Sequence, residues 1–166
     1  MADEKIMIIV GEGVVRRAPV VFSSVGLGSC VVVTLYDTKR CIGGLAHIML
    51  PGNRRRTTVP LSAENEVYHY ADTAIVALLK EMTNKGASLS DIVAKIAGGA
   101  KMFADGEHYE KSIGGRNVTS IKQLLKREQI SVVGEDTGAS HGRNVDFHLD
   151  SGRVIISTIG GMDKEI

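Results

Sequence analysis

The sequence predicts a single α/β domain with two main helices and a mostly antiparallel or mixed sheet. The length of 166 residues fits one domain with a sizeable core. Short β-branched runs separated by glycine fill the first fifty residues, which is typical of strands. Two later segments place their apolar residues at helical spacing instead. Because no repeat, low-complexity stretch or linker interrupts the chain, residues 1–166 are expected to form one domain.

The first third of the chain is expected to form strands, in Val/Ile-rich runs that end at turn-forming or charged residues. These strands are Ile6–Val10, Val20–Phe22, Val31–Tyr36 and Cys41–Met49. Pro51 and Gly52 end the last of them, and the polar segment that follows predicts a loop. The three arginines of that loop, Arg54–Arg56, are either a solvated surface or a docking patch for an acidic partner.

The pattern changes to a helical period between Ser62 and about Asn84, with Ser62 as N-cap and Gly86 as the stop. A second helix is expected over Val118–Glu128, with Asn117 at its N-terminus. The remaining strands are expected at Ile92–Ala97, Ile130–Val133, Val145–Leu149 and Val154–Ile159. The small residues Gly98-Gly99-Ala100 lack the spacing of a nucleotide-binding loop, which favours close backbone packing over a phosphate cradle.

The composition excludes several classes of function. A net charge of +1 gives no field for nucleic acid or a membrane surface, and 4% aromatic residues without Trp give no platform for stacking bases. The apolar run near the N-terminus is too short for a signal peptide or a span, so no membrane insertion is expected. Two cysteines are too few for a disulfide framework. A cytoplasmic protein with reduced thiols is therefore expected.

A predicted hairpin brings a cysteine and a histidine together. The polar loop Asp37–Arg40 joins Val31–Tyr36 to Cys41–Met49, and pairing Tyr36 with Cys41 puts Cys30 directly opposite His47. Directly opposed side chains share a face and have Cβ atoms about 4.5–5.5 Å apart, which is the geometry of a nucleophile and its base. The other face of this hairpin is apolar throughout, so burial requires the same register. A bulge at Gly43-Gly44 would shift it.

A third group is needed to fix the tautomer of the imidazole, and Ser24 is the candidate because its hydroxyl can accept from the distal ring nitrogen. Six extended residues span about 20 Å, so the chain between Ser24 and Cys30 must bend, which Gly26 and Gly28 permit. The bend would expose backbone N–H groups around Gly28 and Ser29, an expected oxyanion hole.

Each of these residues also has a plainer interpretation. A cysteine in an apolar run is often buried filling, and Cys41 is expected to be structural. A zinc site made of Cys30, Cys41 and His47 would lack both CxxC spacing and a fourth ligand, so no metal is expected. A redox-sensing thiol at Cys30 is a further alternative. A redox thiol would leave the placement of Ser24 and His47 unexplained.

Five blocks of sequence, in order and over nearly the whole chain, resemble the chemoreceptor glutamine deamidase family, CheD. The blocks are Gly26–Cys30, Gly43–Pro51, Lys95–Phe103, Ile113–Asn117 and Gly142-Arg143. The resemblance implies that Cys30 is the nucleophile, His47 the base and Ser24 the third member, where the family usually has threonine. The segment Asp136–Ala139 departs from the paired glycines that are usual there.

The same resemblance implies an α/β/α sandwich, a cysteine hydrolase related to the deamidating bacterial toxins. The implied reaction converts glutamine side chains on the cytoplasmic helices of methyl-accepting chemotaxis receptors to glutamate, with release of ammonia, through a thioester and without a cofactor. A secondary glutamyl methylesterase activity is implied by the shared intermediate. The alternative that it leaves open is a non-catalytic chemotaxis adaptor that binds a CheC-type phosphatase.

Overall fold

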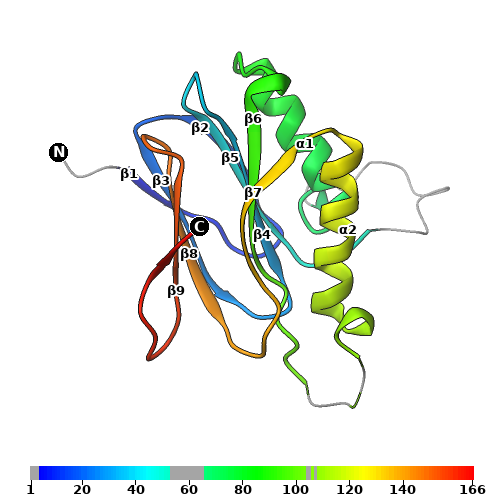
Figure 1. The fold of residues 1–166 in the computed structure, drawn as a ribbon. Coiled ribbons are helices and arrows are strands. Elements are labelled where there is room, and N and C mark those ends of the chain that lie inside the picture. Colours follow the sequence, from blue (N-terminus) through cyan, green and yellow to red (C-terminus); the bar gives the residue numbers. More distant parts are fainter. Residues whose placement is uncertain (1–3, 53–65, 104–105, 107) are drawn as a thin grey trace.

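The computed structural model describes residues 4–52, 66–103, 106 and 108–166 (Figure 1). Two expected features, the N-cap Ser62 and the arginine run Arg54–Arg56, lie outside these residues. The described residues form two five-stranded sheets and two α-helices, together with the short 3-10 turns η2 (Leu89–Asp91) and η3 (Tyr109–Lys111).

Each sheet is mixed. Sheet A has the order β1-β3-β8-β9-β10 and sheet B the order β2-β5-β4-β6-β7. β1 runs parallel to β3 and β6 parallel to β7, whereas the other neighbouring pairs are antiparallel. Sheet A consists of β1 (Glu4–Met7), β3 (Val20–Leu27), β8 (Arg143–His148), β9 (Arg153–Ser157) and β10 (Lys164–Glu165). Sheet B consists of β2 (Gly13–Arg17), β5 (Ile42–Ile48), β4 (Val31–Asp37), β6 (Ile92–Gly98) and β7 (Ser131–Thr137).

The α/β class with two main helices is confirmed, but the order of the layers is not α/β/α. The helices α1 (Ala71–Asn84) and α2 (Ile113–Arg127) pack against each other and against one face of sheet B. Sheet A covers the opposite face of sheet B, so the layers run helices, sheet B, sheet A (Figure 1). The third layer, which was expected to be helical, is therefore sheet A.

The handedness of chain crossovers explains why both helices share one face. β5 and β6 are parallel to each other because both pair antiparallel with β4, and β7 is parallel to β6. α1 connects β5 to β6 and α2 connects β6 to β7, so both crossovers advance in the same direction across sheet B. Crossovers between parallel strands are almost always right-handed, and two of one hand that advance in one direction place their helices on one face.

Alternation along β4 divides the interior into two cores. Val31, Val33 and Leu35 belong to the cluster between sheet B and the helices, whereas Val32 and Tyr36 belong to the cluster between the sheets. Every residue of β4 and β5 is buried, which is the position of central strands covered on both faces. The apolar face predicted for this hairpin is therefore buried as expected, and it packs on the helices.

The register predicted for the hairpin is wrong by two residues. Val32, not Cys30, lies opposite His47, and the ladder closes at Asp37 and Ile42. The reason is the turn: the Asp37 carboxylate accepts the backbone N–H groups of residues 39 and 40, at 3.0 and 2.9 Å, which makes Asp37 the last strand residue. The ladder is continuous past residues 43 and 44, so no bulge forms there. A shift of two residues preserves the face of every side chain.

Both helices begin at positions other than those expected. α1 is described from Ala71, with Tyr70 as the N-cap. α2 begins at Ile113 behind Ser112, whose hydroxyl accepts from the Gly115 N–H at 3.1 Å. The first turn of α2 contains two glycines, which weaken any helix prediction. A side chain on Gly114 would overlap the backbone of the loop after β6, so close packing requires the glycine.

Candidate active site

Ser24 and His47 meet across the space between the two sheets. Ser24 lies on β3 of sheet A and His47 on β5 of sheet B, and their Oγ and Nδ1 atoms are 2.8 Å apart. Ser24 is 0% exposed and His47 is 4% exposed. The contact predicted between the serine hydroxyl and the ring is thus present, and it joins strands of different sheets.

The serine also fixes which ring nitrogen carries the proton. Its hydroxyl donates to the backbone carbonyl of Ile8 at 2.7 Å, which uses its single hydrogen. Nδ1 of His47 must then donate to Ser24, so Nε2 keeps its lone pair and can accept a proton. Burial lowers the pKa of His47, and the hydrogen bond with the Ile8 backbone raises it by less. The ring is consequently neutral at neutral pH.

Cys30 immediately precedes β4 and packs against the apolar cluster between the sheets, the side of sheet B that His47 also faces. Burial raises the pKa of its thiol, and a hydrogen bond from its own backbone N–H lowers it by less. Within the part of the chain that the structure describes, no hydrogen bond joins this thiol to His47. The two groups therefore rest as neutral thiol and neutral imidazole, not as an ion pair.

The bend expected between Ser24 and Cys30 is made by a bulge and one glycine. The pairing of β3 with β8 shifts between Ser24 and Leu27, where Gly26 adopts a φ of 71°. The Gly26 N–H donates to the side-chain oxygen of Asn144 at 2.9 Å, which anchors the bulge. Of the two glycines expected to permit the bend, only Gly26 has a positive φ.

The segment from Gly28 to Cys30 is held by its carbonyl groups. The Gly28 oxygen accepts from the Ala100 N–H at 2.9 Å, and the Cys30 oxygen accepts from the Gly99 N–H at 2.8 Å. In a trans peptide the N–H of the next residue points away from the carbonyl, so fixing the Gly28 oxygen aims the Ser29 N–H to the other side. Among the described residues, the N–H groups of Ser29 and Cys30 meet no backbone acceptor of another residue. They remain available to a negatively charged oxygen.

Asn117 is a site residue that the sequence interpretation missed. It was expected at the N-terminus of the second helix, but it lies inside α2, is 0% exposed, and donates from Nδ2 to the carbonyls of Ser29 and Met49, each at 2.9 Å. An asparagine beside a predicted helix start is most simply interpreted as a cap, and only the true start of the helix at Ile113 excludes that role.

A groove of about 210 Å³ opens beside Ser29, between the loop after β6 and the first turn of α2. Three of the exposed large apolar side chains of the protein stand along it, and they are Met102, Phe103 and Ile113, exposed by 47%, 75% and 43%. Lys111 and Arg116 also line the groove, so apolar and cationic groups lie together next to the segment that carries Cys30. This composition suits an amphipathic helix with an acidic side.

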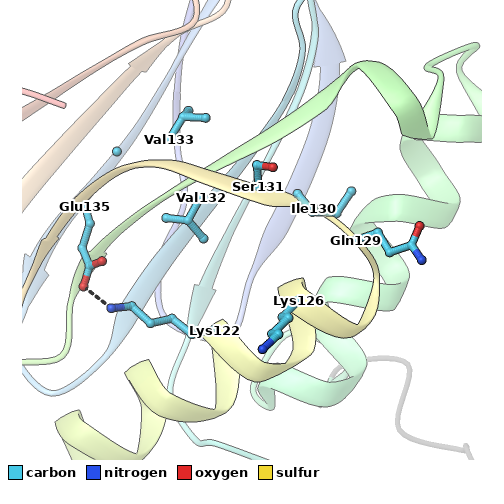
Figure 2. A pocket seen from close by; sticks show the side chains of 9 residues that line it. Lys122, Lys126, Gln129, Ile130, Ser131, Val132, Val133 and Glu135 are labelled. Carbon is cyan, nitrogen blue, oxygen red and sulfur yellow. Dashed lines mark ion pairs between the residues drawn. The ribbon is translucent and has the colours of Figure 1, made fainter.

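A second groove, of about 680 Å³, is remote from these residues. Figure 2 shows it between the C-terminal half of α2 and β7, with Lys122 directed at Glu135, whose charged atoms are 2.7 Å apart. Its lining includes no residue of β5 or of the segment from Ser24 to Cys30, whereas Ser29 lines the first groove, so the second groove is not the candidate active site. In the described ranges no group of three or more His, Cys, Asp or Glu side chains gathers as a metal ligand set, and Cys41 lies at the far end of the hairpin from Cys30.

A family model described as CheD chemotactic sensory transduction matches residues 49–158. The chain belongs to the CheD family. It is similar to the probable chemoreceptor glutamine deamidase CheD of Moorella thermoacetica, with 40% identity over 95% of this chain and 92% of the relative. It is 38% identical to the chemoreceptor glutamine deamidase CheD of Thermotoga maritima, over 96% of both chains. The family resemblance predicted from the five sequence blocks is therefore confirmed.

The matches to other CheD proteins cover more than the family model does. The probable chemoreceptor glutamine deamidase CheD 1 of Methanosarcina acetivorans is 36% identical over 100% of both chains. The segment matched by the family model begins at Met49, after Ser24, Cys30 and His47, so it says nothing about these three residues. In the described residues of this CheD protein, no helix is long and apolar enough to cross a bilayer.

Proposed function

We propose that the protein is a cytoplasmic chemoreceptor glutamine deamidase, which hydrolyses glutamine side chains of methyl-accepting chemotaxis receptors to glutamate and ammonia. Three relatives of nearly full length carry that activity in their names. The observation that carries the proposal is the Ser24–His47 hydrogen bond, which leaves Nε2 of the ring as a base on the side of sheet B where Cys30 packs.

The first half of the reaction forms a thioester. The sulfur of Cys30 attacks the side-chain amide carbon of the glutamine while Nε2 of His47 accepts the thiol proton, because both groups start neutral. The negative charge moves to the amide oxygen, where the N–H groups of Ser29 and Cys30 donate to it. The protonated ring then gives its proton to the leaving nitrogen. The C–N bond breaks and ammonia departs.

The second half hydrolyses the thioester. His47 takes a proton from water as the water oxygen attacks the same carbon, and the proton returns to the sulfur as the C–S bond breaks. Glutamate is released and Cys30 is restored, so the whole scheme consumes one water and needs only side chains and backbone of this chain. Throughout, Ser24 accepts from Nδ1 and stabilises the ring when it is charged. A glutamyl methyl ester would pass through the same thioester, which supports a secondary methylesterase activity.

The groove beside Ser29 is proposed to receive the receptor. A chemoreceptor helix presents its glutamine from an amphipathic surface, and the groove offers three exposed apolar side chains together with Lys111 and Arg116. A helix lying there would reach the segment that carries Cys30 from outside. The cationic residues predict that turnover on an acidic helix weakens as salt concentration rises.

Mass spectrometry of a receptor cytoplasmic fragment tests the proposed function. Wild-type protein is expected to add about one dalton at particular glutamines, Cys30→Ala protein is expected to add none, and Cys41→Ala protein is expected to behave as wild type. Cys41 is the matched control because the chain has only two cysteines. Unmodified fragments with all three proteins, together with capture of a CheC-type phosphatase by wild-type protein, would replace the deamidase proposal by the adaptor alternative.

A further inference from the structure

Asn117 links the two segments that carry the nucleophile and the base. Its Nδ2 group donates to the carbonyl of Ser29, which precedes Cys30, and to the carbonyl of Met49, two residues after His47. Both distances are 2.9 Å, and the side chain is 0% exposed. These carbonyls come from two separate segments, the approach to β4 and the end of β5, and one planar amide satisfies both.

We propose that Asn117 is a positioning residue of the deamidation reaction, which holds the Ser29–Cys30 peptide at a fixed orientation relative to the strand of His47. This inference rests on the proposed function. The carbonyl of Ser29 and the N–H of Cys30 belong to the same rigid peptide plane and point in opposite directions. Fixing the oxygen from the α2 side therefore aims the Cys30 N–H away from α2, where it can donate to the oxyanion.

The chemistry of the amide is specific to this task. Two carbonyl oxygens require two N–H donors from one short, planar group, and an aspartate has none to offer. A leucine has a similar volume, but its methyl groups leave both carbonyls without this partner.

The other end of the amide argues against a role in packing alone. The Oδ1 atom of Asn117 is buried without a hydrogen-bond partner among the described residues. A buried polar atom without a partner is unfavourable, so an apolar side chain would suit a purely structural position better. The two hydrogen bonds from its Nδ2 group to the carbonyls of Ser29 and Met49 explain why the residue is an asparagine.

Asn117→Leu tests the proposal, with Ser120→Ala as the matched control. Ser120 lies on the same helix and donates to the carbonyl of Pro51 at 2.5 Å, so it also ties α2 to the segment after β5. Among the described residues, no hydrogen bond joins its side chain to the approach to Cys30. Thermal unfolding establishes that both variants are folded. Deamidation of the receptor fragment gives kcat and KM, and the rate of iodoacetamide alkylation against pH gives the apparent pKa of the thiol.

For Asn117→Leu we expect kcat to fall by about 100-fold with KM within about twofold, because orientation is lost while the receptor surface is untouched. We also expect the alkylation midpoint to move to higher pH, since the backbone N–H that lowers the Cys30 pKa is no longer held. Ser120→Ala should change neither. An Asn117→Leu protein with wild-type kcat and an unmoved alkylation profile overturns the inference.

The alkylation readout separates this inference from the proposed function. If wild-type protein modifies no receptor, the deamidase proposal fails, and a displaced alkylation midpoint in Asn117→Leu alone then supports only the positioning of the Cys30 backbone by Asn117. If wild-type protein is active and Asn117→Leu loses activity only in the same proportion as Ser120→Ala, the loss is structural and the positioning role is refuted.

Discussion

Replacing Ser24 by alanine removes one hydroxyl with two partners. Its Oγ lies 2.7 Å from the Ile8 carbonyl and 2.8 Å from Nδ1 of His47, and the residue is fully buried. Because the residue has no exposed surface, the groups that the hydroxyl satisfies are left to pair with each other or to remain unpaired. The variant Ser24→Ala therefore tests both stability and the tautomer of the ring.

The size of the effect follows from these contacts. Two lost hydrogen bonds in a buried setting cost about 2 kcal/mol of unfolding free energy, at about 1 kcal/mol each. The charged ring that forms during the reaction also loses its partner, and a hydrogen bond to a charged group contributes about 1.5–3 kcal/mol, where about 1.4 kcal/mol corresponds to a tenfold change in rate. We therefore expect kcat to fall by at least about tenfold, with KM unchanged because Ser24 is remote from the surface.

The assay is ammonia release from a receptor fragment, paired with urea denaturation. Ser23→Ala is the matched control, since Ser23 is its neighbour on β3, is 2% exposed and donates to Asp146 at 2.6 Å. That variant should lose comparable stability and keep kcat. Ser24→Thr retains the hydroxyl and should keep most of the activity. If Ser24→Ala and Ser23→Ala have the same kcat at equal folded fraction, the orienting role of the serine is wrong.

Two further predictions follow from burial and a third from backbone geometry. In a Cys41→Ala background, iodoacetamide should alkylate Cys30 with a midpoint above the ordinary thiol pKa of about 8.5, because burial raises that pKa; a lower midpoint contradicts a neutral resting thiol. Burial lowers the pKa of His47 in the folded state, so below about pH 6.5 the unfolded chain binds a proton at His47 that the folded chain does not bind. Urea denaturation should therefore show that wild-type protein loses unfolding free energy below this pH and that His47→Gln protein does not lose this contribution. Gly98 has a φ of 112°, and a methyl group there would overlap the Cys30 carbonyl, whereas Gly86 has a φ of 99° and open space around it. Gly98→Ala should therefore lower the midpoint of thermal unfolding more than Gly86→Ala. Equal losses would mean that the structure relieves the overlap.

Sequence patterns predicted much of the architecture because they report local preferences. All eight expected strands overlap a strand of the structure, and both helices exist, with bounds displaced by local features such as the glycines at the start of α2. β2 was missed because Gly13–Arg17 has only two apolar residues, and its strand conformation depends on pairing with β5. The layer order was also wrong, since crossover direction across a sheet is a property of topology and is not carried by any one segment.

The candidate site also has features that the sequence predicted and features that it did not. Residue types and spacing were enough to single out Cys30, His47 and Ser24 as candidates. The predicted register of the hairpin was wrong by two residues, but a two-residue shift keeps every side chain on the predicted face of the sheet. The turn that set the true register depends on hydrogen bonds to the Asp37 carboxylate, which a strand pattern does not reveal.

The sequence alone therefore determined the candidate site residues and the family to which the chain belongs, because both are local patterns of residue types. Only the tertiary structure decided how those residues meet. The serine reaches the histidine from another sheet, and Asn117 on α2 bonds to Ser29, which is 88 positions away along the chain. Contacts between distant segments depend on how layers stack, and stacking is set by the packing of the whole domain.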